Sequence, residues 1–333
     1  MKKLGIALLI LVVLVAIAIT FTIGWRPFIG PRMRPVTNRT FESTPARLAR
    51  GGYLFHSVAL CVDCHSPHDN TSKDWPVIAG KEGSGQAFPL SGLPGQLVAP
   101  NITPDPETGL GNWTDDQIAR AIREGVDKDG RTLFPLMPYG NYRSMSDEDL
   151  ASVVVFLRSL PPVRNPLPMS QIIFPVKYLI RNAPEPLTSP VPPSDSSTPA
   201  NRGEYLALIG GCADCHTPQK RGEPIAGMNF SGGTVMAGPW GSVATANITP
   251  DPSGISYYDE KLFADVMRTG YVHARRLSVI MPWQYYRGMT DQDLSDIFAY
   301  IKTVSAVAHR VDNTETPTLC KKCGNVHGLG DKN

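Results

Sequence analysis

The chain has 333 residues, of which 42% are hydrophobic, and its formal net charge is only +2. So small an excess of positive charge gives no strong field for nucleic acid or for an acidic partner, and we expect no nucleic-acid partner. Thirty glycines and thirty-one prolines predict loop-rich domains.

The first 25 residues predict a membrane anchor. Residues 4–23 are uncharged and almost wholly apolar. A helix of this length spans about 30 Å, which is the thickness of the hydrocarbon core of a bilayer. A cleaved signal peptide normally has a shorter apolar region that ends in a small-x-small site. Because no convincing site follows, residues 1–25 are predicted to form an uncleaved, single-pass anchor.

A Cys-x-x-Cys-His motif at residues 61–65 is typical of covalent haem c attachment. Cys61 and Cys64 would lie on one face of a helical turn, where two thiols can form thioether bonds to the vinyl groups of one porphyrin. His65 would then be the proximal iron ligand. Cys-x-x-Cys alone also occurs in redox pairs, zinc sites and structural disulfides, but none of these requires the adjoining histidine.

Met137 is the candidate for the sixth iron ligand in the first domain, which is predicted to span residues 42–165. It lies in a Leu-Met-Pro-Tyr segment, where proline restricts the backbone of the loop. Met145 is an alternative, but the Ser-Asp-Glu-Asp-Leu that follows it predicts a helix N-cap and favours a core or helix-start role. His56 and His68 are further alternatives that have no counterpart in the second domain.

Helices are expected where N-caps and acidic first turns mark their starts. In the first domain these helices cover residues 115–124 and 147–160, and in the second they cover residues 259–269 and 291–304. The last helix of each domain should turn apolar side chains inward. These side chains are Phe156, Leu157, Ile297 and Tyr300.

Residues 166–198 are rich in proline and predict an extended, fairly stiff linker. The second domain, predicted at residues 199–310, then repeats the motifs of the first in the same order. Its haem motif contains Cys212, Cys215 and His216.

Met281, in a Met-Pro-Trp segment, matches Met137 and is the expected sixth ligand of the second domain. A Met-Thr-Asp-Gln-Asp-Leu segment follows it, as the corresponding segment follows Met137. The two domains should therefore share one fold.

An Asn-Ile-Thr-Pro-Asp segment begins at Asn101 and again at Asn247. It is rich in turn formers, so its main value is expected to be conformational, and a role in lining the haem is the alternative. Paired arginines offer several donors to haem propionates, although solvated surface positions would explain them equally well. The candidate haem-pocket residues are Asn101, Arg143, Asn247 and Arg287, and Arg123 and Arg268 are also paired between the domains.

The tail, residues 311–333, contains Cys320-Lys-Lys-Cys323 with glycine where a haem motif needs histidine. A third haem is therefore not expected. A short disulfide, a metal knuckle completed by His327 and an unpaired flexible tail remain open, and an exported location favours oxidation.

The two haem motifs, the Asn-Ile-Thr-Pro-Asp segments and the Met-Pro-Tyr/Trp loops resemble membrane-bound cytochromes c related to the cytochrome subunit of bacterial alcohol and aldehyde dehydrogenases. The resemblance covers both domains and implies an all-α fold, with two tandem class I cytochrome c domains after a transmembrane helix. It implies two covalently bound haems c. One would be held by Cys61, Cys64, His65 and Met137, and the other by Cys212, Cys215, His216 and Met281.

Electron transfer is the expected function, because histidine and methionine would fill both axial positions of each iron and leave no site for oxygen or peroxide. One alternative is a haem enzyme, such as a dihaem peroxidase or a thiosulfate-type dehydrogenase, in which one iron is catalytic. Another is a structural or sensory haem protein that moves no net electrons.

The resemblance also implies a location and partners. The haem domains would lie in the periplasm, on the outer side of the cytoplasmic membrane. Electrons would pass from a dehydrogenase towards a quinone-linked complex or a terminal oxidase. The related dehydrogenase subunit typically has three haem motifs where this chain has two, a difference that bears on the dehydrogenase partnership.

Overall fold

The computed structural model describes residues 2–220, 222–314 and 316–328. The chain forms two compact units. The smaller unit combines Met1–Thr40, Trp113–Arg143 and Gln171–Pro190. The larger unit combines Phe41–Asn112, Ser144–Ser170 and Val191–Asn333. Both haem motifs belong to the larger unit, and the first predicted domain contributes residues to both units.

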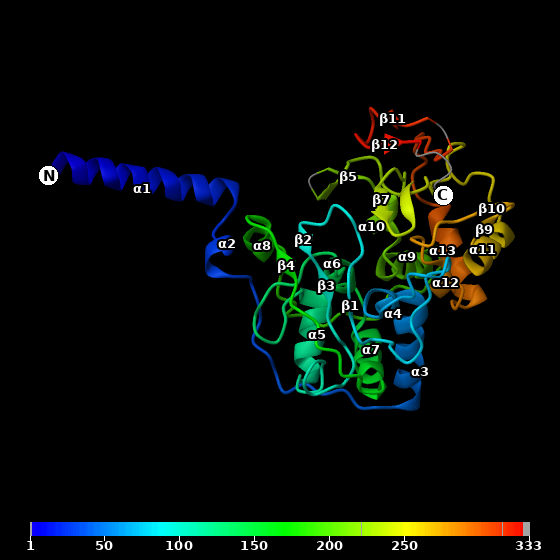
Figure 1. Ribbon diagram of the computed structural model, residues 1–333, viewed down its shortest axis with the longest axis horizontal. Coiled ribbons are helices and arrows are strands. Elements are labelled where there is room, and N and C mark those ends of the chain that lie inside the picture. Colours follow the sequence, from blue (N-terminus) through cyan, green and yellow to red (C-terminus); the bar gives the residue numbers. More distant parts are fainter. Residues whose placement is uncertain (1, 221, 315, 329–333) are drawn as a thin grey trace. The chain divides into compact units, whose positions relative to one another are not determined.

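Helix α1 (Lys2–Thr22) occupies the predicted anchor region (Figure 1). After Lys2 and Lys3 it is apolar on all sides, and none of its residues is buried. The helix is long enough and, with a mean hydropathy of 3.2, apolar enough to cross a membrane. A membrane anchor and a signal sequence both have these properties.

Helix α5 (Asp115–Glu124), in the smaller unit, has the predicted bounds. Thr114 and Gln117 form a capping box at its start. Gly125 ends the helix with φ 68°, and a Cβ there would lie 2.6 Å from the ring of Tyr139, so only glycine fits. The other described helices of this unit are α1, α2 (Arg26–Ile29), α6 (Tyr139–Tyr142), α8 (Val176–Leu179) and the 3₁₀-helix Ile180–Asn182.

The core of the larger unit is built from two pairs of crossing helices, one pair for each sequence repeat (Figure 1). In the first repeat α3 (Pro45–Tyr53) packs on α7 (Asp147–Ser159). In the second repeat α9 (Pro199–Ile209) packs on α13 (Asp291–Ile301). The first and last helices of each repeat therefore meet in the same way.

A glycine allows each crossing. A Cβ on Gly51 would lie 2.0 Å from the carbonyl oxygen of Ser152, and a Cβ on Gly203 would lie 1.8 Å from that of Asp296. These distances are far below van der Waals contact, so the helix backbones touch where a side chain is absent. The two glycines follow the paired arginines of the repeated Arg-Gly motif.

The predicted helix starts are confirmed in the larger unit. The Ser146 hydroxyl caps α7 by accepting the backbone N–H of Asp149 at 3.1 Å. Helix α11 (Glu260–Thr269) is capped by Asp259, and α13 begins at Asp291. Two helices end earlier than predicted, α7 at Ser159 and α13 at Ile301. Extended or irregular chain follows each of them directly.

The predicted inward faces are confirmed for the aliphatic residues. Leu157 is 4% exposed and Ile297 is 2% exposed. Phe156 is half-buried, with its ring centroid 5.2 Å from that of Phe55.

Short antiparallel strand pairs lie in the loops and qualify the all-α expectation. The pairs in the larger unit are β1 (Gln86–Ala87) with β3 (Val98–Ala99), β5 (Gln219–Lys220) with β6 (Glu223–Pro224), β7 (Val235–Gly238) with β8 (Gly241–Ala244), β9 (Tyr271–Val272) with β10 (Arg275–Arg276), and β11 (Thr318–Leu319) with β12 (Val326–His327). Strands β2 (Gly95–Gln96) and β4 (Gln171–Ile172) are also short. The fold is mostly helical. Strands of two to four residues are too short to produce the alternating pattern by which a strand is predicted.

Candidate haem sites

Cys61 and Cys64 begin and end a one-turn helix, α4 (Cys61–Cys64), as their spacing predicts. His65 follows directly, and its backbone N–H donates to the Cys61 carbonyl at 2.9 Å. Leu60, just before the helix, has the left-handed conformation with φ 53°, which turns the chain sharply into the motif. A π-helical turn, Leu54–Val58, connects α3 to this point.

The second motif is built in the same way. Cys212, Cys215 and His216 lie in α10 (Cys212–His216), and Gly211 precedes it with φ 70°. Glycine here occupies the left-handed position that Leu60 occupies in the first repeat.

Both motif histidines are oriented by a backbone carbonyl. Nδ1 of His65 lies 2.8 Å from the oxygen of Pro100, and Nδ1 of His216 lies 2.7 Å from that of Ala246. Because a carbonyl only accepts, each Nδ1 carries the proton and each Nε2 keeps a free lone pair. This is the tautomer in which histidine binds a metal, with a second partner fixing its ring.

Burial lowers the pKa of both histidines, and the carbonyl bonds oppose this effect only in part. Neutral imidazole is therefore favoured at both positions, as iron ligation requires.

The asparagine loops carry these carbonyls. Asn101 follows Pro100, and its Oδ1 accepts from the backbone N–H and the hydroxyl of Thr103 at 2.9 and 2.7 Å. Its Nδ2 donates to the Val163 carbonyl at 2.7 Å. Because the side chain is occupied by protein partners, the conformational interpretation of the motif is favoured over haem lining.

Asn247 makes the same bonds in the second repeat, to Thr249 at 2.9 and 2.8 Å and to the Val307 carbonyl at 2.8 Å. Each loop thus fixes the carbonyl that orients the histidine of its own repeat. The roles of Pro100 and Ala246 could not be predicted from the sequence, because a backbone carbonyl leaves no side-chain signal.

The four motif cysteines are poor nucleophiles as free thiols. Burial raises the pKa of Cys61 and Cys212 to about 12 and that of Cys215 to about 11. The pKa of Cys64 is also raised, first by burial and then by the neighbouring Asp63. A redox-active Cys-x-x-Cys needs a lowered thiol pKa, so this environment disfavours the redox-pair alternative.

The paired methionines fall into two classes. Met145 and Met289 are 1% and 3% exposed, as expected of core residues. Met137 and Met281 are half-buried, in loops with the same backbone bonds. In each loop the methionine N–H donates to the residue three positions earlier, at 3.1 Å.

Met281 lies just before α12 (Trp283–Tyr286) in the larger unit, whereas Met137 lies in the smaller unit. Ligation of iron by these two methionines stays a prediction.

The two alternative histidine ligands have protein partners. Nδ1 of His56 lies 2.9 Å from the Gly52 carbonyl, and its Nε2 lies 3.2 Å from a Glu82 carboxylate oxygen. His68 is 5% exposed, stacks on Trp75 with ring centroids 3.9 Å apart, and places Nε2 2.9 Å from the Tyr285 hydroxyl. These partners favour structural roles for both residues.

The candidate propionate partners are bound to protein in part. The Arg143 guanidinium donates to the Glu185 carbonyl. The Arg268 guanidinium donates to the Arg287 carbonyl and pairs with Asp291 at 2.6 Å, while the Arg287 side chain is exposed. Contact of Arg143 and Arg287 with a haem stays a prediction.

Residues 200–305, which include the second motif, match the family model for cytochrome c. The chain contains a cytochrome c domain. A cytochrome c domain implies covalently bound haem c, and the residues fit this group: two thiols one helical turn apart, followed by a histidine with a free Nε2.

The resemblance to dehydrogenase cytochrome subunits is confirmed. The chain is 31% identical over 291 residues to the fructose dehydrogenase cytochrome subunit of Gluconobacter japonicus, covering 80% of this chain and 55% of that subunit. It is 27% identical over 304 residues to the cytochrome c subunit of the quinone alcohol dehydrogenase of Gluconobacter oxydans, covering 85% and 61% of the two chains. The chain thus spans about half to three fifths of the length of these two relatives.

A third relative is closer to this chain in length. It is a diheme cytochrome c-type protein of Cereibacter sphaeroides, 27% identical over 286 residues, which are 82% of this chain and 92% of the relative.

Proposed function

We propose that this protein is a dihaem c-type cytochrome that transfers electrons as a carrier or as the redox subunit of a membrane complex. One observation carries the proposal. The histidines of both motifs donate Nδ1–H to the carbonyl that precedes an Asn-Ile-Thr-Pro loop, at 2.8 and 2.7 Å. The family match covers the second repeat, and this shared geometry supports the same chemistry in the first.

Two residue sets would hold the haems: Cys61, Cys64, His65 and Met137, and Cys212, Cys215, His216 and Met281. Each bound haem would supply an iron that cycles between ferric and ferrous states. The thioether ligands would favour the ferrous state, and filled axial positions would exclude oxygen and peroxide. The protein orients each imidazole through a backbone carbonyl, so little rearrangement is needed when an electron enters or leaves.

The named relatives are dehydrogenase cytochrome subunits and support a dehydrogenase as electron donor. The acceptor would be a quinone-linked complex or a terminal oxidase. Helix α1 would anchor the chain in the cytoplasmic membrane, with the haem domains in the periplasm, where c-type haems are attached. The two dehydrogenase subunits extend beyond the part that this chain matches, so the identity of the donor belongs to the proposal.

Visible spectra of the membrane-extracted protein test the proposal, together with a pyridine haemochrome count and a redox titration. The expected result is two covalent, low-spin haems, a weak far-red band from methionine bound to ferric iron, and no binding of carbon monoxide. One high-spin haem that binds carbon monoxide would contradict the carrier function and make that iron a catalytic site. A single covalent haem would contradict the dihaem assignment.

A further inference from the structure

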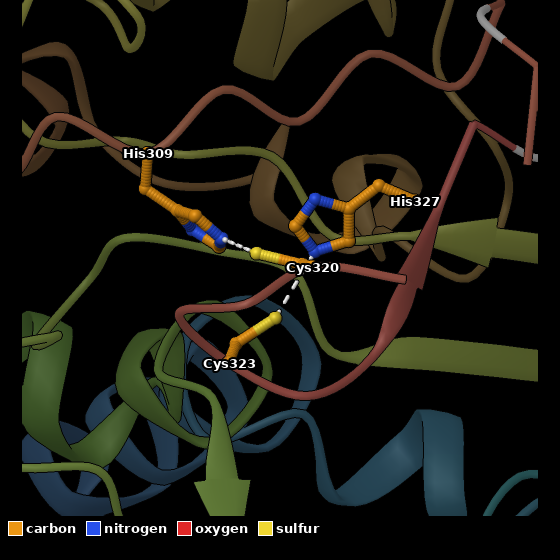
Figure 2. A group of neighbouring side chains, drawn as sticks. All are labelled: His309, Cys320, Cys323 and His327. Carbon is orange, nitrogen blue, oxygen red and sulfur yellow. Dashed lines mark hydrogen bonds between the residues drawn. The ribbon is translucent and has the colours of Figure 1, made fainter. Parts of the chain in front are cut away.

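Four side chains near the end of the chain converge on one point, and none of them belongs to a Cys-x-x-Cys-His motif. His309, Cys320, Cys323 and His327 each offer one ligand atom, and these atoms all lie within 4.8 Å of one another (Figure 2). Nε2 of His309 lies 3.3 Å from Sγ of Cys320, and Nε2 of His327 lies 3.2 Å from Sγ of Cys323. The ligands of a tetrahedral zinc ion are separated by about 3.3–3.8 Å, so small movements suffice to enclose an ion.

A hairpin positions three of the four residues. Strands β11 and β12 pair with Leu319 opposite Val326, and the Cys-x-x-Cys segment forms the turn between them. The Cys320 sulfur accepts the backbone N–H of Lys322 at 3.4 Å, and the Cys320 carbonyl accepts that of Gly324 at 2.9 Å. Gly324 has φ 74°. A tight turn that directs an N–H group at a cysteine sulfur stabilises a thiolate ligand.

Both histidines are held in the tautomer that binds metal. Nδ1 of His309 lies 2.8 Å from the Ser231 carbonyl, and Nδ1 of His327 lies 3.2 Å from the Arg310 carbonyl. Because carbonyls only accept, the protons are on Nδ1 and both Nε2 lone pairs face the sulfurs. The two haem-motif histidines are fixed by the same device.

The first repeat shows what His309 adds. Asn165 occupies the equivalent position, and its Nδ2 donates to the Ser84 carbonyl at 2.8 Å, as His309 does to Ser231. The backbone N–H groups match too: that of Asn165 donates to Thr108 at 3.0 Å, and that of His309 donates to Ser253 at 2.9 Å. An amide is therefore sufficient for the structural bond. The imidazole brings a second nitrogen, which faces Cys320.

The site is buried against the second repeat. His309, Cys323 and His327 are 2%, 7% and 8% exposed. Gly233 lies against both imidazoles, where a Cβ would be 2.6 Å from Nε2 of His327. Asn325 donates to the Gly233 carbonyl at 3.0 Å, which holds the hairpin on the domain.

We propose that His309, Cys320, Cys323 and His327 bind one zinc ion that fastens the C-terminal hairpin to the second cytochrome domain. Two thiolates and two imidazoles in tetrahedral reach are a typical structural zinc set, and four protein ligands leave no position for substrate. Binding displaces the thiol protons of the two cysteines. Zinc also protects a Cys-x-x-Cys pair from forming a disulfide in an oxidising compartment.

The proposed site lies next to the second haem motif. The segment that contains Ser231 continues to Gly232, whose N–H donates to the His216 carbonyl at 2.7 Å. In the first repeat Gly85 donates to the His65 carbonyl at the same distance, and the described residues form no cluster of metal-ligand side chains beside it. The zinc would therefore support the hairpin and this segment, while haem attachment itself does not depend on it.

The test is elemental analysis of the full-length, haem-loaded protein, purified without chelator. We expect about one zinc per chain, with iron counted separately, and zinc K-edge spectra with two sulfur ligands near about 2.3 Å and two nitrogen ligands near about 2.0–2.1 Å. Cys323→Ser should abolish zinc binding. His309→Asn should keep the bond to Ser231, as Asn165 does in the first repeat, but should lose zinc in a chelator dialysis that the unmodified protein withstands.

A matched control is His273→Asn, because His273 is exposed and in the same unit, and its left-handed φ of 53° suits asparagine. This variant should retain zinc. All three variants should keep the haem spectrum of the unmodified protein, which shows that they have folded. Absence of zinc with a Cys320–Cys323 disulfide on peptide mass analysis would overturn the proposal. Retention of zinc by both the Cys323→Ser and His309→Asn variants, or binding of another metal at this site, would also overturn the proposal.

Discussion

The Tyr205 hydroxyl of the second repeat donates a hydrogen bond to the Asp149 carboxylate of the first repeat, at 2.6 Å. The same hydroxyl accepts the backbone N–H of Ser146, the N-cap of α7, at 3.1 Å. The reverse contact also exists: Tyr53 of the first repeat donates to Asp293, and its hydroxyl accepts the N–H of Thr290 at 3.2 Å. The two repeats therefore face each other through a reciprocal pair of contacts at helix N-termini.

Removing these hydroxyls should weaken the association of the repeats. A hydrogen bond to a carboxylate contributes about 1.5–3 kcal/mol, and Asp149 keeps Arg50 as a partner at 2.7 Å. We expect Tyr205→Phe to lower the free energy of unfolding by about 1–2 kcal/mol, and Tyr53→Phe to act similarly. Denaturant unfolding followed by circular dichroism measures this change. Tyr271→Phe, at an exposed tyrosine of the same unit, should have almost no effect.

The same tyrosines predict a loss of stability at alkaline pH. Burial, followed by the bond to Asp293, raises the pKa of Tyr53 to about 12. Burial, followed by Asp149, also raises the pKa of Tyr205. An unfolded tyrosine titrates near about 10. Because the pKa is higher in the folded state than in the unfolded state, each protonated tyrosine stabilises the folded state fully below about pH 10. This stabilisation is lost as the pH rises towards about 12.

The melting temperature should therefore fall between about pH 10 and 12, and Tyr53→Phe combined with Tyr205→Phe should flatten this fall. Thermal melts in parallel buffers over this range provide the measurement. If the double variant loses stability as steeply as the unmodified protein, other groups control the alkaline transition.

The helix crossings should tolerate no side chain at their glycines. A Cβ on Gly51 or Gly203 would overlap a backbone carbonyl of the partner helix, at 2.0 or 1.8 Å. The overlap can be relieved only if the two helices of the pair move apart. We expect Gly203→Ala to cost about 3 kcal/mol or more and to reduce the yield of haem-loaded protein. Gly140→Ala is the control, because a Cβ there meets nothing within 4 Å. Equal yields of haem-loaded protein for the two variants would show that the crossing can relax.

The sequence predicted those features that depend on local rules. Helix α5 has its predicted bounds, and α7 and α13 begin at their predicted residues, because N-cap side chains and acidic first turns act within a few residues. The Cys-x-x-Cys-His spacing likewise predicted thiols one turn apart.

Contacts between distant segments were missed. The local sequence indicates only His327 as a histidine partner for the tail cysteines. Yet Nε2 of His309 lies 3.3 Å from Sγ of Cys320, about as close as Nε2 of His327 lies to Sγ of Cys323. The pairing of Tyr205 with Asp149 was missed as well, since nothing local to a tyrosine indicates which repeat it contacts.

The two classes of methionine predict different spectra. If Met281 ligates iron, Met281→Ala should abolish the far-red band of one haem, convert its ferric iron to high spin and permit carbon monoxide to bind. Met289→Leu should leave the spectra unchanged, because Met289 is 3% exposed and leucine nearly conserves its volume, at a cost below about 1.5 kcal/mol. Spectra of each ferric variant, with a carbon monoxide titration of the ferrous form, separate the two cases. A spectral change in the Met289 variant but not in the Met281 variant would reverse the assignment. The iron ligand would then be the buried sulfur of Met289 and not the loop sulfur of Met281.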